Sequence, residues 1–202
     1  MKKILCYVYE NMADFEIVLT LHCLRNKGEI QPVMISENRE PVTAQSGMRI
    51  VPDLAISGIS EEILAESVGL LIPGGPISPE QNEICPMIRR MAGDGKLVAA
   101  MCFAPQFLGR AGILNDHKFT TSCGKEYIKR LGCEDPFVWE NFENKRLVVD
   151  GNVLTAQGNA FVDAAEKISE ILDVFPDEGQ RTEYFRKINA RQAAPCQTLS
   201  TQ

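Results

Sequence analysis

This chain of 202 residues has no apolar run near the length of about 20 residues that a membrane-spanning helix needs. The apolar run that starts near Lys3 is short and ends at Glu10, so it does not form a secretory signal peptide. Basic residues are outnumbered, with 21 Lys and Arg against 27 Asp and Glu, and no local cluster reverses the formal net charge of -6. Such a charge argues against nucleic-acid binding. We therefore expect a cytoplasmic protein that has neither a membrane nor a nucleic acid as partner.

Paired cysteines are also missing. The seven cysteines are odd in number, irregularly spaced and without a C-x-x-C pair, so we expect neither a disulfide framework nor a structural zinc site. We predict no metal and no cofactor. Histidine occurs only at positions 22 and 117. We expect His22 to pack on the apolar side of a helix and His117 to lie exposed in a turn, so that neither serves as a base.

The residues that are present indicate a soluble α/β protein, with 45% hydrophobic and 24% charged residues. Near-continuous apolar runs are typical of strands that are covered on both faces, and they alternate here with segments of helical periodicity. The expected strands cover residues 4–9, 30–35, 68–72 and 97–101, and the expected helices cover residues 15–27, 79–91 and 161–174. This alternation predicts a doubly wound, mostly parallel sheet.

Three further features complete the prediction of the fold. Residues 41–52, around Ser46-Gly47, and residues 146–155, around Asp150-Gly151, have the pattern of antiparallel hairpins. A helix follows Pro176, and a frayed tail covers residues 190–202. The aromatic patch Phe137-Val138-Trp139 is expected in the core or in a pocket wall.

Cys102 stands between the strand Leu97–Met101 and residues 103–110, which read as the first turns of a helix. A cysteine on such a turn lies beside free backbone N–H groups and the positive end of the helix dipole. This setting lowers the pKa of a thiol and exposes the reactive thiolate. The alternative is a small apolar side chain packed behind the strand. The motif alone leaves both interpretations open.

A second motif, Pro73-Gly74-Gly75-Pro76, follows the strand expected over residues 68–72. Two glycines at the carboxyl end of a strand allow a tight turn whose N–H groups point into the crevice where α/β sheets bind ligands. Together with the N–H of Phe103, these donors would hold an oxyanion or a sulfenate near Cys102. The plain alternative is a loop with two glycines.

Glu16 lies near the start of the first expected helix, at the same edge of the sheet. A carboxyl next to a thiolate is expected to titrate high and to donate a hydrogen bond to the sulfur. The competing interpretation is an ordinary solvated glutamate in a first helical turn, where the helix dipole favours it.

In this order, the three motifs resemble the ThiJ/PfpI superfamily, which comprises flavodoxin-like proteins related to class I glutamine amidotransferases and includes relatives of the parkinsonism-associated deglycases. The resemblance covers residues 1–175 and is best to the bacterial intracellular protease/amidase-like branch. It implies a flavodoxin-like fold with a small antiparallel hairpin addition and a homodimer. Residues 1–176 would form one ThiJ/PfpI-like domain, and residues 177–202 a C-terminal helix and flexible tail. The matching segments are residues 13–17, 71–75, 99–102, 110–114 and 149–158.

The resemblance also implies roles for particular residues. Cys102 would be the nucleophile or an oxidisable thiol, and Glu16 its protonated partner. The backbone N–H donors would come from Gly74, Gly75 and Phe103.

This chain departs from the superfamily at two places. Peptidase-like members carry a histidine directly after the cysteine, where this chain has Phe103. Other members carry one at the end of the next strand, expected here over residues 118–123, where Ser122 stands. We expect Ser122 and Cys123 to line the pocket. Without a histidine, no group protonates a leaving amine, so peptidase activity is not expected.

Three functions remain open. The first is a cysteine-dependent enzyme of glyoxalase or deglycase type, whose partner is a small electrophile such as a 2-oxoaldehyde. An amidase- or hydratase-type hydrolase needs the same parts, although the hydratase relatives look as if they carry an aspartate at the position of Glu16. The second is a non-enzymatic oxidative-stress sensor in which Cys102 forms a sulfinate and Cys123 acts as a resolving thiol. The third is a dimeric scaffold without activity.

Overall fold

The computed structural model describes residues 1–190, so the tail expected over residues 190–202 lies almost wholly outside the described part. Its centre is a seven-stranded sheet in which only β8 runs antiparallel to its neighbour. The strand order is β5 (Leu54–Ala55), β2 (Gln31–Ser36), β1 (Lys3–Tyr7), β6 (Ser67–Ile72), β7 (Leu97–Met101), β9 (Val153–Ala156) and β8 (Leu147–Asp150).

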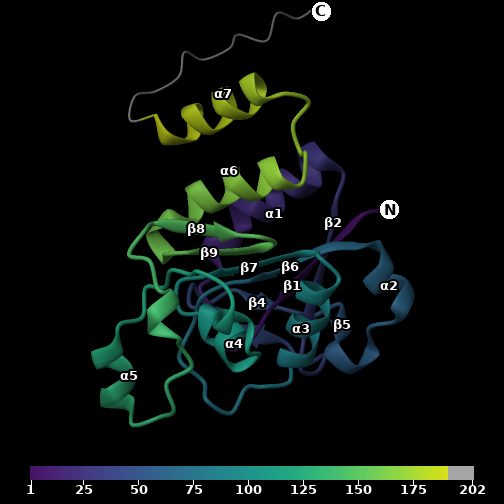
Figure 1. The fold of residues 1–202 in the computed structure, drawn as a ribbon. Coiled ribbons are helices and arrows are strands. Elements are labelled where there is room, and N and C mark those ends of the chain that lie inside the picture. Colours follow the sequence, from purple (N-terminus) through teal and green to yellow (C-terminus); the bar gives the residue numbers. More distant parts are fainter. Residues whose placement is uncertain (191–202) are drawn as a thin grey trace, which may run out of the picture.

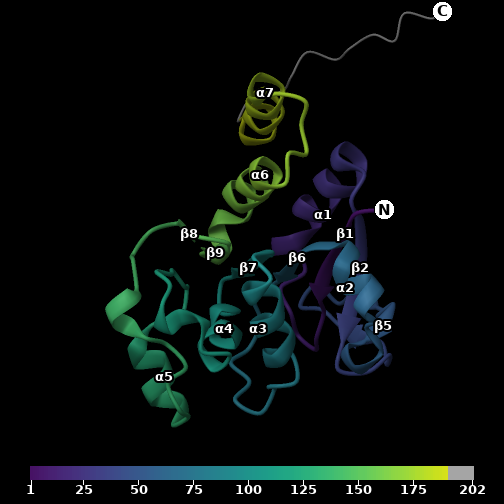
Figure 2. The ribbon, with the colours of Figure 1, turned by 45° about the vertical axis from the view of Figure 1, so that its right-hand side comes forward.

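Helices cover both faces of this sheet (Figures 1 and 2). On one face α1 (Phe15–Gly28) packs against α6 (Phe161–Ile171), and α7 (Glu178–Asn189) packs on the outer side of α6. The other face carries α3 (Cys85–Gly93) and α4 (Pro105–Arg110). The fold is therefore the predicted flavodoxin-like, doubly wound type. Within residues 1–190, no helix combines the length and apolar character that crossing a membrane requires.

The local sequence explains why these elements form. All residues of β7 are buried, as parallel strands with helices on both faces require. The predicted hairpin over residues 41–52 is confirmed as β3 (Val42–Thr43) paired with β4 (Arg49–Ile50). The second hairpin is confirmed as β8 and β9, joined through Gly151, which has a φ of +60°. Glycine adopts this left-handed backbone without the penalty that other residues incur.

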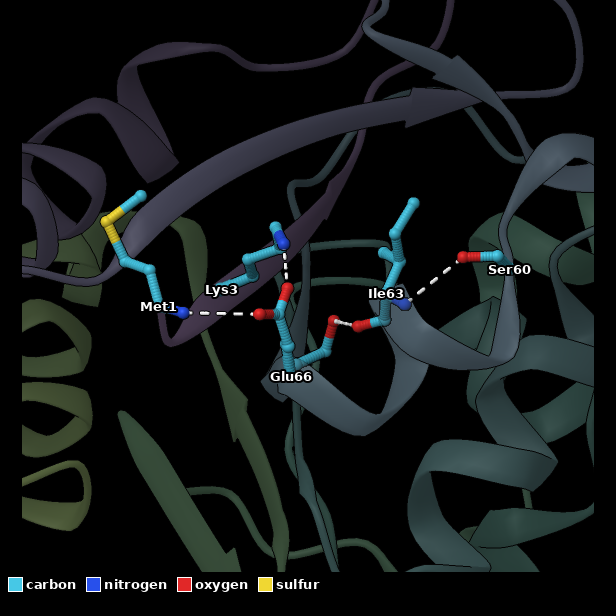
Figure 3. Close-up of polar contacts among 6 residues, drawn as sticks. Met1, Lys3, Ser60, Ile63 and Glu66 are labelled. Carbon is cyan, nitrogen blue, oxygen red and sulfur yellow. Dashed lines mark hydrogen bonds and ion pairs between the residues drawn. The ribbon is translucent and has the colours of Figure 1, made fainter.

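A short helix that the sequence analysis missed, α2 (Glu61–Glu66), leads into β6. The Ser60 hydroxyl accepts a hydrogen bond from the Ile63 N–H at 3.3 Å and so caps the first turn. At the other end of the helix, Glu66 pairs with the amino terminus at 3.2 Å and with Lys3 (Figure 3). These contacts lie where β1 and β6 begin, so they hold the amino edge of the sheet and leave its carboxyl edge free.

Two expected elements differ in the structure. The helix expected over residues 79–91 begins only at Cys85, because Pro86 fits only in the first turn of a helix. The strand expected over residues 118–123 is wrong, since only one isolated bridge, Phe119 to Phe142, forms there. Hydroxyl groups in this segment bond to other carbonyls in place of a strand ladder: Thr120 donates to Lys145 and Thr121 to Cys102. A further helix, α5 (Lys125–Leu131), was not predicted.

The two histidines also differ from expectation. The buried stripe of α1 contains Glu16, Ile17, Thr20, Cys23 and Leu24, and His22 falls outside it and is exposed. His117 is half-buried rather than exposed, with its Nδ1 3.7 Å from the Asp150 carboxylate at the β8–β9 turn. That turn lies at the end of β9 opposite to Cys102. Phe137 and Trp139 pack on Phe119, as expected for core residues.

Candidate functional site

Three loops meet at the carboxyl edge of the parallel strands. The segment after β1 leads to Glu16 at the start of α1, the loop after β6 contains Gly74 and Gly75, and Cys102 follows β7 directly. Ligand crevices of open α/β sheets form at this edge. The expectation that these residues lie together is met, because the Ala13 N–H donates to the Gly74 carbonyl at 2.7 Å and joins two of the loops.

Cys102 has a backbone conformation that few residues other than glycine adopt. Its φ is +56°, in the left-handed region. The neighbours hold this strained turn: the Cys102 N–H donates to the Ala156 carbonyl at 2.7 Å, and the Cys102 carbonyl accepts hydrogen bonds from the Ser122 N–H at 3.0 Å and the Thr121 hydroxyl at 2.7 Å. Strain that is held in this way is concentrated at functional sites.

Glu16 is almost fully buried, with 1% of its surface exposed. Its Oε2 accepts a hydrogen bond from the Gly74 N–H at 2.7 Å. A Cβ on Gly74 would lie 2.8 Å from this oxygen and 2.5 Å from the Cys102 Cβ. A Cβ on Gly158 would lie 2.7 Å from Glu16 Oε1 and 3.1 Å from Cys102 Sγ. The carboxyl and the thiol therefore share one small space, and only glycine fits at both of its walls.

The pKa values of these two groups depend on each other. Burial raises the pKa of Glu16, while the hydrogen bonds from Gly74 and Cys102 lower it. Burial raises the pKa of Cys102 to about 12, and the negative charge of Glu16 is the second cause. The expectation of a thiol pKa lowered by a helix terminus is therefore wrong for this structure, because α4 starts only at Pro105 and the sulfur lies beside a carboxylate.

Ser122 stands at the open side of the site. Its hydroxyl oxygen accepts a hydrogen bond from the Gly158 N–H at 3.0 Å, which leaves its O–H free to donate. Hydrogen bonding to this side chain and to the Phe103 N–H lowers the pKa of Cys102, against the effect of burial. Ser122 is exposed, so the site opens to solvent here. Ser122 therefore lies in the site, as expected. It has a hydroxyl at the position where the resemblance would have implied a histidine.

The structure changes the set of backbone donors. The Gly74 N–H is occupied by Glu16 and is not free to bind an oxyanion, contrary to expectation. The Gly75 N–H makes no hydrogen bond with any of residues 1–190, and the Phe103 N–H faces the sulfur. Tyr9 supports this loop, because its hydroxyl donates to the Pro73 carbonyl at 2.9 Å. Gly75 and Phe103 thus remain the candidate oxyanion donors.

Cys123 is buried, and its thiol lies 3.9 Å from the Gly124 carbonyl. Burial raises the pKa of Cys123 to about 11. A neutral, buried thiol is a poor resolving group, so the structure gives no support to that role.

Several site residues were missed from the sequence. Tyr9 and Thr121 carry no motif that distinguishes them from ordinary strand or loop residues. Gly158 ends the segment 149–158, which carries the resemblance, but it was given no role in the site. The signal that could have found Gly158 is its place directly after a strand that ends at the same edge. No three side chains of His, Cys, Asp or Glu within residues 1–190 converge in a way that would hold a metal ion.

Comparisons with known proteins find similarity over most of this chain. Residues 2–171 match the DJ-1/PfpI family. A Bacillus subtilis protein that bears the name of an uncharacterized protease is 28% identical over 202 residues, which cover 95% of this chain and 92% of that protein. A deglycase of Thermococcus kodakarensis is 30% identical over 159 residues, which cover 77% and 89% of the two chains.

Two further similarities bear on function and fold. A glutathione-independent glyoxalase of Caenorhabditis elegans is 27% identical over 170 residues, which cover 81% of this chain and 84% of that protein. The crystal structure of a ThiJ/PfpI family protein from Bacillus anthracis superposes with a TM-score of 0.78 at 26% identity, covering 95% of this chain and 92% of that one.

Proposed function

This chain belongs to the DJ-1/PfpI family, and from that membership and the geometry of its site we propose that it is a cysteine-dependent enzyme of glyoxalase or deglycase type. Its substrates would be small electrophiles, 2-oxoaldehydes above all. The observation that carries the proposal is the buried Glu16 carboxyl, which accepts a hydrogen bond from the Gly74 N–H and lies beside the sulfur of Cys102. Relatives with the names deglycase and glyoxalase support the same reaction type.

The first step forms a carbon–sulfur bond. Because the pKa of Cys102 is raised to about 12, the thiol carries its proton at neutral pH. Glu16 takes this proton as the sulfur attacks the aldehyde carbon, and it then passes the proton to the aldehyde oxygen. The product is a hemithioacetal, and the N–H groups of Gly75 and Phe103 stabilise the oxygen while it is negative.

The second step moves a hydrogen between adjacent carbons. The Glu16 carboxylate removes the proton from the carbon that bears sulfur and returns it to the neighbouring ketone carbon, through an enediol. In the same step the hydroxyl proton of the hemithioacetal passes to the ketone oxygen. This transfer oxidises the first carbon to a thioester and reduces the second to an alcohol, without an external oxidant. Water then hydrolyses the thioester, which releases a 2-hydroxy acid and the free thiol of Cys102. Ser122, at the open side of the site, lies where water enters.

Burial supports the assignment of one carboxyl to both proton transfers. A base is most effective when its pKa lies near the working pH, and burial raises the pKa of Glu16 from its ordinary value in that direction. An exposed glutamate would be too weak a base for a thiol or a carbon acid. The burial of Glu16 thus supports a role in proton transfer and not the other interpretation, an ordinary solvated glutamate in the first turn of a helix.

The other functions find less support. Peptide hydrolysis needs a proton donor for the leaving amine, and neither histidine lies at the site: His22 is exposed on α1 and His117 is at the β8–β9 turn. A sensor needs a thiolate that oxidises readily, and the raised pKa of Cys102 disfavours that thiolate. The proposed enzyme differs because Glu16 takes the thiol proton during the attack. The name of the Bacillus subtilis relative therefore does not transfer its implied activity to this chain.

Homodimer formation is part of the same proposal. Phe15 and Val18 on α1 have 53% and 51% of their surface exposed, which is high for large apolar side chains. Light scattering coupled to size-exclusion chromatography measures the mass in solution. A mass equal to one chain would contradict the dimer.

The enzymatic proposal is tested with methylglyoxal. Purified protein should convert it to lactate without glutathione, as measured by proton NMR. Cys102→Ala should abolish the conversion, whereas Cys133→Ala, at a half-buried thiol outside the site, should leave it unchanged. Conversion that persists in Cys102→Ala would refute the proposed role of this residue.

A further inference from the structure

Apart from the site around Cys102, a cavity of about 440 Å³ lies at the end of α4 that is farther from Cys102. The end of α4, the segment before α3 and the segment 134–138 enclose it. Gly109 lets that last segment approach closely, because a Cβ at Gly109 would meet the Pro136 carbonyl oxygen at 1.7 Å. The volume falls within the range of roughly 300–1,000 Å³ that is usual for small-ligand sites. Polar lining residues include Asn82, Arg110 and Asn115.

Arg110 brings a positive charge to this cavity and forms no ion pair within residues 1–190. No carboxylate lies within 4.0 Å of its guanidinium among residues 1–190, and its Nε is buried without a hydrogen-bond partner. Burial lowers the pKa of Arg110. A partly buried cation that lacks a partner costs free energy. An unpaired group of this kind calls for an explanation, and a bound ion is one.

The guanidinium of Arg110 is held in place before any ligand arrives. Its Nη2 donates to Gln106 Oε1 at 3.0 Å, and its centre lies 5.0 Å from the centre of the Phe107 ring. Gln106 is itself fixed, because its side chain bonds to Ser78 and Pro76. The Nη1 group makes no hydrogen bond with residues 1–190 and remains free to donate. A rigid donor of this kind lowers the entropic cost of binding.

Two acidic residues also line the cavity, and they limit the charge of the ligand. Each oxygen of the Asp135 carboxylate accepts one hydrogen bond, from the Phe137 N–H at 3.0 Å and from the Trp139 indole N–H at 2.7 Å. Glu134 is exposed. Its negative charge would repel a ligand of high charge but would tolerate a single anionic group.

We propose that this cavity is a binding site for a small anion with one carboxylate or phosphate group, which accepts hydrogen bonds from Arg110. A guanidinium group suits both anions, because its N–H groups donate charge-assisted hydrogen bonds to carboxylate and phosphate oxygens alike. The proposal stands on the cavity and on the unpaired arginine. It does not depend on the chemistry of Cys102.

Isothermal titration calorimetry at low ionic strength tests the site, with sodium phosphate and sodium acetate as probes and sodium chloride as the control. We expect one saturable site for at least one probe, and the probe that binds identifies the anion class. Arg110→Gln should weaken binding about tenfold or more, which corresponds to about 1.4 kcal/mol, and Arg110→Lys should weaken it less. Glu134→Gln should strengthen binding, because it removes a repulsive charge. Cys102→Ala should bind as the wild type does, which separates this site from the proposed enzyme.

The same experiment can overturn the proposal. Absence of saturable binding by both probes would do so, as would unchanged affinity in Arg110→Gln with its fold verified by circular dichroism. Glu134 is exposed, so Glu134→Gln remains informative even where Arg110→Gln does not fold. Weaker binding in Glu134→Gln would mean that the site prefers a positively charged group, contrary to the proposal.

Discussion

Replacing Glu16 by Gln should change the two reactivities of Cys102 in opposite directions. The pKa of Cys102 is raised from an ordinary value of 9.0 to about 12, first by burial and second by the negative charge of Glu16. The neutral Gln removes the second cause and leaves the first. Each unit by which the pKa falls increases the thiolate fraction about tenfold at a pH well below it. Because Glu16 is the smaller of the two main causes, we expect a gain of about tenfold in alkylation by iodoacetamide at roughly pH 8.

Catalysis should respond in the other direction, because Gln cannot carry the proton between sulfur, oxygen and carbon. Loss of a positioned acid–base group costs about 10²–10⁴ in rate. The rate of alkylation is measured by quenching the iodoacetamide reaction at intervals and recording intact mass spectra, and the catalytic rate is measured as lactate formation. Slower alkylation in Glu16→Gln would refute the reasoning, since it would mean that Glu16 favours the thiolate. Unchanged lactate formation would refute the role of Glu16 in proton transfer.

Three other changes follow from the same geometry. Gly74→Ala should abolish activity, because its Cβ would lie 2.5 Å from the Cys102 Cβ, whereas Gly93→Ala, with open space around it, should be active; lactate assays compare the two. Ser122→Ala should slow alkylation of Cys102, because the Ser122 hydroxyl lowers the pKa of this thiol, and faster alkylation would contradict that effect. Above about pH 9, Cys102 and Cys123 lose their protons in the unfolded chain but keep them in the folded protein, because their pKa values are raised there. The folded state then binds more protons than the unfolded state, so the free energy of unfolding falls as pH rises. Urea denaturation at several pH values should show a shallower fall for Cys102→Ala, and an equal fall would exclude this contribution.

Much of the site follows from sequence because of one topological fact. Carboxyl ends of parallel strands share an edge, so the segments that follow β1, β6 and β7 meet at this edge. This rule was enough to predict that Glu16, Gly74 and Cys102 lie at the same edge of the sheet, before any contact between them was known. It also explains why Gly158, which follows β9, belongs there too.

Other properties of the site depend on how deeply a side chain is buried and on which side-chain hydrogen bonds it forms, and sequence patterns predict neither. The pKa of Cys102 is an example: its neighbours in sequence indicate a helix start, but burial and the carboxyl of Glu16 dominate in space. The segment with Thr120 and Thr121 is another, because β-branched residues favour a strand there, yet their hydroxyls bond to carbonyls of distant residues. His22 shows the same limit, since a shift of the buried stripe by one position moves it to the surface.

The central claim is that the sulfur of Cys102 bonds covalently to the substrate and that Glu16 advances this adduct. Rapid-quench mass spectrometry of the peptide that contains Cys102, after mixing with methylglyoxal, tests it most directly. We predict a transient adduct in the wild type that decays as lactate forms, and in Glu16→Gln an adduct that persists without lactate. Lactate formed at the wild-type rate with no adduct at Cys102 would contradict the account.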